Sequence, residues 1–269
     1  MNSPIFSNKL SFLLLLFLSV GLVACDNSDD DEPTPDDNSD ANATLELRLD
    51  HTYANADLTA GTTYSLATGE QLQFSSFQYI LSDFKLFRSN GDTVHLPEAY
   101  FIVDALADNG NVQSLNLGEL PTGDYTGMTF AVGLPYDLNH IDPTTLADDH
   151  PLNNPGMHWG WNPEAGYKFW KIEGSIDSVN GEAGNLDNAL LYHIATDDLL
   201  RYVTSFQDYN FSIDEGSNNL AFYAKVEKAF EGIETEVLNN FSSHTTGNKA
   251  IVESIADNRN NVFCQCQIQ

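Results

Sequence analysis

The sequence predicts an all-β protein, an antiparallel β-sandwich with a long loop and one or two short helices near the C-terminus. Two observations predict this class. Short runs in which apolar and polar residues alternate recur along the chain, and a period of two is the pattern of strands with one buried face. Asn-Gly dipeptides at 89–92 and 179–182 mark turns between such runs, because Asn-Gly favours a tight hairpin. Many short strands joined by turns are typical of a sandwich.

The N-terminus has the features of a secretory signal. A basic residue, Lys9, precedes an apolar run that ends in Leu-Val-Ala-Cys at residues 22–25. This ending resembles the lipobox of bacterial lipoproteins, so we expect a signal peptide over 1–24 and lipidation of Cys25. An ordinary signal peptide with a chance cysteine is the alternative.

An acidic segment follows the cysteine. Residues 25–43 contain many Asp residues, two prolines and no large apolar side chain, so they cannot bury enough surface to offset the entropy of ordering. We expect a disordered tether that joins the lipid anchor to a single domain over 44–269. A similar acidic run marks surface export in many Bacteroidetes-type lipoproteins, so we expect an outer-membrane lipoprotein exposed at the cell surface.

The charge balance excludes one class of partner. The chain has 11 Lys and Arg against 39 Asp and Glu, a formal net charge of −28. Such a surface repels phosphate backbones and anionic headgroups. We therefore expect no nucleic-acid partner and no membrane contact beyond the N-terminal lipid.

Strand patterns occupy most of the domain. They lie at residues 44–50, 72–87, 100–105, 112–117, 125–133, 167–176, 190–194, 209–213, 220–226 and 262–268. Helical periodicity appears only late, at 226–241 and 248–258, where apolar residues recur at spacings of three and four.

The segment 133–166 has little periodicity and joins two predicted strands. It contains several prolines and three histidines, His140, His150 and His158. Loops of this length within a compact domain are usually functional. Imidazoles are good ligands for copper and zinc, although no pair of histidines here has the local spacing of a zinc motif.

Catalytic motifs are missing from the sequence. There is no Gly-x-Ser-x-Gly elbow, no glycine-rich phosphate loop and no recognisable carboxylate pair, so we expect a protein that is not an enzyme. Cys264 and Cys266 lie two apart in a predicted strand and therefore on one face. They form a redox pair, a soft-metal site or two thiols without function.

Three stretches together resemble a known family. They are GLPYDLNHIDP at 133–143, the run from His150 to Gly174, and YHIATDD at 192–198. They resemble successive signatures of the MbnP-like family, periplasmic or surface copper-binding proteins related to those encoded beside methanobactin genes. YILSDFKLF at 79–87, followed by SNGDTVHL, is also similar to an early strand pair of that family.

The resemblance implies a β-sandwich and a single copper ion held by two histidines and an oxidised tryptophan. The histidine of the Leu-Asn-His signature is His140, and that of the later strand is His193. The modified tryptophan of the family aligns with Leu138, so the third ligand is missing on this alignment. His51, His158 or water is then the candidate third ligand.

The tryptophan cluster at 158–174 has two interpretations. The alternation of the strand at 167–176 places Tyr167 and Trp170 in the core, whereas Trp159 and Trp161 lie in the loop and either wall a site or pack. The leading hypothesis is a lipid-anchored extracytoplasmic protein that scavenges, buffers or delivers copper, with a redox or copper-delivery protein as partner. The alternative is a surface binding or adhesion module that has lost the metal and uses the loop aromatics against a carbohydrate or a protein.

Overall fold

The structure, a computed structural model, describes residues 42–107, 112–160, 162–177, 185–233, 242–244 and 248–267. The signal peptide, most of the acidic tether and the predicted turn at 179–182 lie outside the described residues. The first strand, β1 (Asn42–Tyr53), begins two residues before the expected boundary at 44. Ala43 is buried, so the end of the expected tether belongs to the domain.

The smaller sheet has β1 at its centre. The remaining strands are β2 (Ala56–Asp57), β7 (Val112–Pro121), β13 (Ser217–Lys225) and β15 (Phe263–Gln267). β7 pairs with β1 antiparallel, but β13 pairs with it parallel. This pairing departs from the wholly antiparallel expectation, because two strands so far apart in sequence are not constrained by a hairpin.

The larger sheet is organised by the long strand β4 (Gln71–Arg88). β9 (Lys168–Ile176) pairs with its first half and β8 (Gly123–Val132) with its second half. The chain between β8 and β9 therefore leaves and returns near the middle of β4. The other strands are β3 (Tyr64–Ser65), β5 (Thr93–Leu96), β6 (Phe101–Asp104), β10 (Asn188–Ala195), β11 (Arg201–Val203), β12 (Phe211–Ile213) and β14 (Ser242–His244).

Aromatic side chains fill the space between the two sheets. Tyr79 of β4 lies 5.3 Å in ring centroid distance from both Trp170 of β9 and Phe263 of β15. Trp170 and Tyr167 are buried, as the alternation predicts. Each buried aromatic side chain contributes about 1.5 to 3 kcal/mol or more, so these rings stabilise the sandwich without any ligand.

The helices are short. α2 (Lys249–Asp257) is the second predicted helix and packs against β10. The first predicted helix, over 226–241, is wrong at its start, where the 3₁₀ helix η4 (Val226–Phe230) forms instead of an α-helix. Its residues 234–241 lie outside the described residues. The other α-helices of the described residues are two four-residue helices, α1 (Tyr136–Asn139) and α3 (Arg259–Val262). Within the described ranges, none of the helices is long and apolar enough to span a bilayer.

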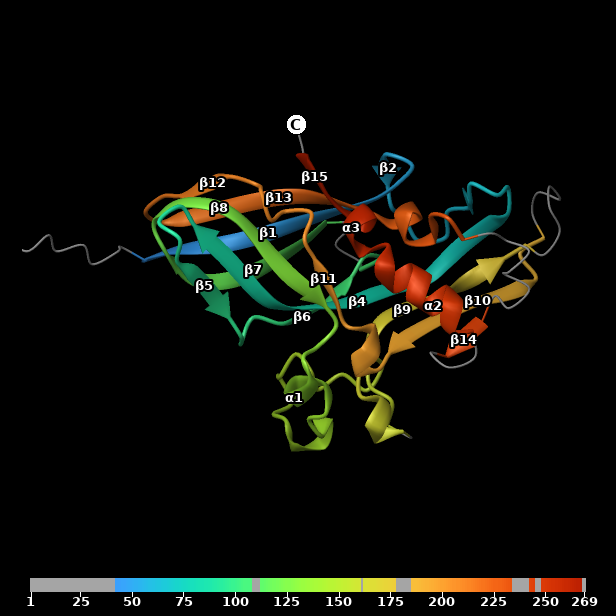
Figure 1. The fold of residues 1–269 in the computed structure, drawn as a ribbon. Helices are drawn as coiled ribbons and strands as arrows, with labels where there is room; N and C mark the ends of the chain where they lie inside the picture. Colours follow the sequence, from blue (N-terminus) through green and yellow to red (C-terminus); the bar gives the residue numbers. More distant parts are fainter. Residues whose placement is uncertain are drawn as a thin grey trace, which may run out of the picture. The chain divides into compact units, whose positions relative to one another are not determined.

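The long loop projects beyond the strand ends. Figure 1 shows α1 lying beside the segment that precedes β9, on the side of the larger sheet where β9 begins and β10 ends. The 3₁₀ turns η1 (Pro143–Thr145) and η2 (Pro163–Ala165) are the other ordered elements of this loop. The loop that carries His140, His150 and His158 therefore lies beyond this end of the larger sheet.

Candidate functional site

Asn139 fastens the loop to two strands. Its side chain is fully buried, its Oδ1 accepts a hydrogen bond from the Tyr167 backbone N–H (2.8 Å), and its Nδ2 donates to Asp197 Oδ1 (2.8 Å). Gly166, at φ +65°, packs so closely that an added Cβ would lie 2.3 Å from Asn139 Oδ1. A buried amide with both ends hydrogen-bonded fixes the loop relative to the sheet.

His140 follows Asn139 directly and reaches the same carboxylate. Its Nε2 lies 3.0 Å from Asp197 Oδ2, and its ring packs on Tyr136 with centroids 4.4 Å apart. Asp197 begins the 3₁₀ turn η3 (Asp197–Leu199), which comes directly after β10. Since β10 also carries His193, the structure brings the two family histidines to the same end of the larger sheet.

His193 lies on β10 with its side chain on the outer face of the sheet. Its Nε2 is 2.7 Å from Glu173 Oε1 on β9, and Trp159 packs against its ring, with centroids 5.4 Å apart. Burial alone would raise the pKa of Glu173. The hydrogen bond from His193 and the charge of Lys171 outweigh burial and hold the pKa of Glu173 below its usual value.

Trp159 is held in a small hairpin at the C-terminal end of the loop. Its backbone N–H donates to the Gly166 carbonyl, and the backbone N–H of Lys168 donates to the Met157 carbonyl. The Lys168 ammonium lies 4.8 Å from the Trp159 ring and donates to the Gly156 carbonyl, a cation–π geometry. Trp159 is buried between this cation and His193, so it packs directly against a predicted ligand.

His158 lies in the same hairpin but points elsewhere. It forms an isolated bridge with Tyr167, and its ring meets the Tyr167 ring edge-on at 4.8 Å. Burial lowers the pKa of His158, the charge of Lys168 adds to this, and Asp142 opposes it. The imidazole is therefore neutral at neutral pH.

His51 is not brought to His193. It is fully buried in the sandwich, with Nε2 2.7 Å from the Tyr79 hydroxyl. Tyr79 packs on Trp170, which pairs with Ile194, the neighbour of His193. Successive side chains of a strand point to opposite faces, so the larger sheet separates His51 from His193. The structure therefore does not bring His51, a predicted third ligand, to His193.

The other residues predicted for the site have different positions. Leu138 is half-buried and packs against the core. Trp161 lies outside the described residues, and Cys266 has no described side chain. Sequence reasoning missed Asn139, Asp197 and Glu173, although all three lie within the quoted family signatures.

The donor chemistry of His140 and His193 fits copper, but the two do not belong to a larger cluster of potential ligands among the described residues. Imidazole nitrogen is a favourable copper ligand, and His140 and His193 supply two. Within the part of the chain that the structure describes, no group of three or more His, Cys, Asp or Glu side chains could hold a metal ion. The residues that would hold copper, as the family signatures imply, are His140 and His193.

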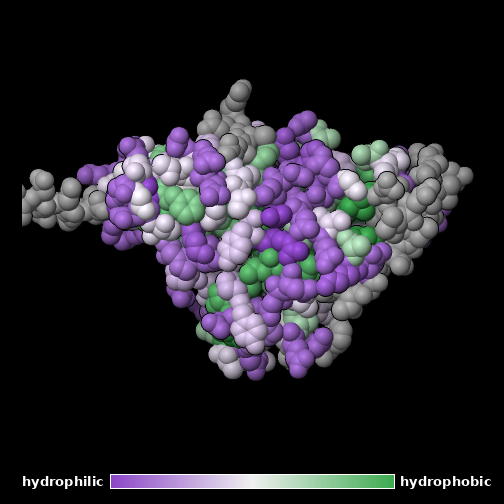
Figure 2. Space-filling model, in the orientation of Figure 1, coloured by the Kyte–Doolittle hydropathy of each residue, from purple (hydrophilic) through white to green (hydrophobic). Residues whose placement is uncertain are grey.

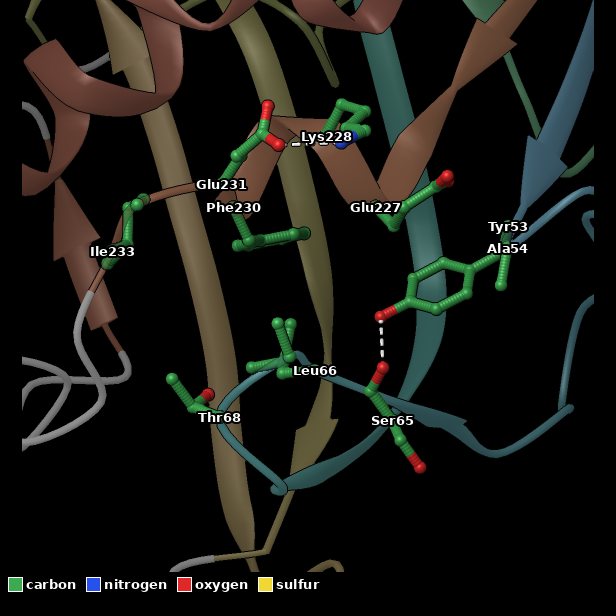
Figure 3. Close-up of a pocket in the computed structure, with 12 residues that line it drawn as sticks. Tyr53, Ala54, Ser65, Leu66, Thr68, Glu227, Lys228, Phe230, Glu231 and Ile233 are labelled. Atoms are coloured by element: carbon green, nitrogen blue, oxygen red, sulfur yellow. Dashed lines mark hydrogen bonds and ion pairs between the residues drawn. The ribbon is translucent and has the colours of Figure 1, made fainter.

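A separate pocket lies between the turn at 65–68 and the segment 227–233, which includes most of η4. Figure 3 shows Leu66 and Phe230 facing each other across it, with Tyr53 and Ile233 at its edges. The pocket has a volume of about 510 Å³ and none of its lining residues is a histidine or cysteine. It is therefore no candidate for copper. The face in Figure 2 is mostly hydrophilic, with apolar side chains gathered only in small areas.

Fold and loop together define a class, a β-sandwich with a histidine-bearing loop fastened at one end of its larger sheet. The sequence profile of the MbnP family matches residues 42–248. The chain therefore belongs to the MbnP family, as the sequence resemblance implied. This membership indicates a copper-related protein of the kind associated with methanobactin.

Comparison with solved structures finds MbnP from Methylosinus trichosporium. The two are 14% identical, with a TM-score of 0.46, and the match covers 71% of this chain and 78% of that one. No curated protein sequence matches the chain.

Proposed function

We propose that this protein binds copper outside the cytoplasm, as a lipid-anchored protein of the outer membrane that scavenges, buffers or delivers the ion. Copper is its cargo, and the protein acts by binding and not by catalysis. Membership in the MbnP family supports the copper-related part of this proposal. The Cys25 sequence context supports the anchor.

One observation carries the binding proposal. The two histidines that the family signatures single out, far apart in sequence, are linked through η3, because His140 contacts Asp197 just beyond the end of the strand that carries His193. Two imidazoles at one end of a sheet, backed by carboxylates and beside Trp159, are suited to a borderline metal ion such as Cu²⁺.

The adhesion alternative gains no support from the described loop aromatics. A tryptophan that binds a sugar presents its ring to solvent, whereas Trp159 is buried between Lys168 and His193. Tyr136 is well exposed, at 65%, but its ring packs on His140. Trp159 therefore serves the histidine site better than a surface partner.

Copper titration of purified variants tests the proposal. We expect His140→Ala and His193→Ala each to weaken the binding of Cu⁺ or Cu²⁺ by more than about 100-fold. Loss of a residue that only supports a metal ligand costs roughly 10- to 100-fold, and loss of the ligand itself should cost more. His95→Ala is the matched control, because His95 lies on β5 and contacts Asp83. Wild-type affinity no better than that of the His140→Ala, His193→Ala double variant would contradict the proposal.

A further inference from the structure

Both candidate ligands use the same ring nitrogen to contact a carboxylate. Nε2 of His140 lies 3.0 Å from Asp197 Oδ2, and Nε2 of His193 lies 2.7 Å from Glu173 Oε1. An ionised carboxylate only accepts hydrogen bonds. Each contact therefore favours the tautomer that carries its proton on Nε2, which leaves the lone pair on Nδ1.

The two carboxylates are themselves held in place. Asp197 accepts from the buried Asn139 amide on its other oxygen, Oδ1 (2.8 Å), and Asn139 is fixed in turn by the Tyr167 backbone. Glu173 lies within β9, and its Oε2 is 3.5 Å from the Lys171 ammonium. In each carboxylate, one oxygen thus contacts a histidine. The other oxygen contacts a neighbouring donor, the Asn139 amide for Asp197 and the Lys171 ammonium for Glu173.

We propose that Asp197 and Glu173 are positioning residues, which hold His140 and His193 in the Nε2–H tautomer, so that Nδ1 is the nitrogen through which each imidazole would bind copper. This inference rests on the proposed copper-binding function. Partners of this kind raise the basicity of a ligating imidazole and fix its orientation. Neither carboxylate has to coordinate the metal.

The Asn139 amide and the Lys171 ammonium make substitutions of the two carboxylates by amides informative, because they determine which way each new amide turns. In Asp197→Asn, the amide oxygen has to face the Asn139 NH₂ group, so the new NH₂ group faces His140. Nε2 of His140 must then accept, and the proton moves to Nδ1. In Glu173→Gln, the Lys171 ammonium attracts the amide oxygen in the same way and turns the NH₂ group toward His193. Both changes preserve side-chain shape.

A third carboxylate–histidine pair provides the control. Nε2 of His95 contacts Asp83 Oδ1 at 2.5 Å, and Asp83 Oδ2 accepts from Lys85 and Tyr202. Asp83 has φ +50°, a conformation that asparagine tolerates well. Asp83→Asn therefore makes the same chemical change at a histidine that is not a predicted ligand.

The experiment combines tautomer and affinity measurements on the full domain. Long-range ¹H–¹⁵N correlation spectra of metal-free protein, recorded at about pH 8 where imidazoles are neutral, report the tautomer of each histidine. We expect Nε2–H for His140 and His193 in the wild type and Nδ1–H for the affected ring in each amide variant. Copper affinity should fall about 10- to 100-fold in Asp197→Asn and Glu173→Gln and stay unchanged in Asp83→Asn. Asp197→Glu, which keeps the acceptor, should recover part of the loss.

Two results overturn the inference in distinguishable ways. If the wild type binds copper through both histidines but the amide variants bind equally well, or if His140 and His193 are Nδ1–H in the metal-free wild type, the positioning role is wrong and the proposed function stands. If the wild type binds no copper, the proposed function fails and the inference fails with it. Melting curves of all variants show whether a loss of affinity comes from unfolding.

Discussion

At the scale of single residues, the loop depends on close packing around one buried amide. Asn139 connects the loop, the start of β9 and η3 through its two hydrogen bonds. Gly166 makes this possible, because its backbone has φ +65° and no side chain occupies the space beside Asn139. The sequence reveals the histidine of the Leu-Asn-His signature, but nothing in its spacing shows that the preceding asparagine is buried.

Gly166→Ala should destabilise the protein strongly. The new Cβ would meet Asn139 Oδ1 at 2.3 Å and the Asn139 backbone oxygen at 2.5 Å, and φ +65° is itself strained for alanine. We expect a loss of about 2 to 4 kcal/mol in the free energy of unfolding, measured by denaturant titration. Gly160→Ala is the control, because no atom lies within 4 Å of a Cβ added there. Equal effects of the two changes would show that the Asn139 packing is wrong.

His158 should make stability depend on pH. Burial and the charge of Lys168 lower its pKa in the folded protein, against the opposing effect of Asp142. The folded state therefore binds a proton less readily than the unfolded state, and stability falls as pH drops below the unfolded value of about 6.5. The melting temperature should fall more between about pH 7.5 and 5.5 in the wild type than in His158→Phe, which keeps the edge-on contact with Tyr167. The same fall in both proteins would exclude this role for His158.

At the scale of elements, the strand patterns were predictable and their partners were not. Alternation locates β1, β4, β8 and β9 to within a few residues, because one face of each is buried. It says nothing about direction, so the parallel pairing of β1 with β13 was missed. The periodicity at 226–241 was misleading for another reason. Its first residues form η4, whose apolar side chains pack against the sandwich, and tertiary packing overrides helix propensity there.

Lys168→Met should loosen the hairpin that holds Trp159. The change removes the hydrogen bond to Gly156 and the contact with the Trp159 ring, together worth about 1 to 2 kcal/mol. Opening of the hairpin should become about 5 to 30 times more frequent, and limited proteolysis should cut within 153–166 faster by a similar factor. Lys171→Met is the control, because Lys171 contacts Glu173 and not the hairpin. Equal cleavage rates would mean that Lys168 does not hold it.

At the scale of the whole molecule, the charge and the N-terminal motif suit a cation-binding protein of the cell envelope. A formal net charge of −28 attracts cations and repels nucleic acid. The fold class and the family were accessible from the sequence, since patterning and motif order are local properties. The full ligand set was not, because it depends on which side of a sheet each histidine lies. His51 lies on β1 of the smaller sheet and is buried in the sandwich, whereas His193 lies on β10 of the larger sheet and contacts Glu173.

Cys25→Ala should release the protein from the membrane fraction. Once the signal peptide is removed, the lipid on Cys25 is the expected anchor, and an acylated cysteine supplies the apolar surface that holds such proteins to a bilayer. Fractionation of cells that express the wild type and the variant, followed by immunoblotting, measures the distribution. Persistent membrane association of the variant would contradict the lipoprotein assignment.

The central claim is that this member of the MbnP family carries copper in its native location. The most direct test of this claim is to purify the protein from the native envelope without added metal or chelator. Its metal content is then measured by elemental mass spectrometry. We predict about one copper per chain in the wild type, as two imidazoles of one site imply, and a large loss in the His140→Ala, His193→Ala double variant expressed from the same locus. Protein that contains no copper, or as much copper in the double variant as in the wild type, would contradict the account.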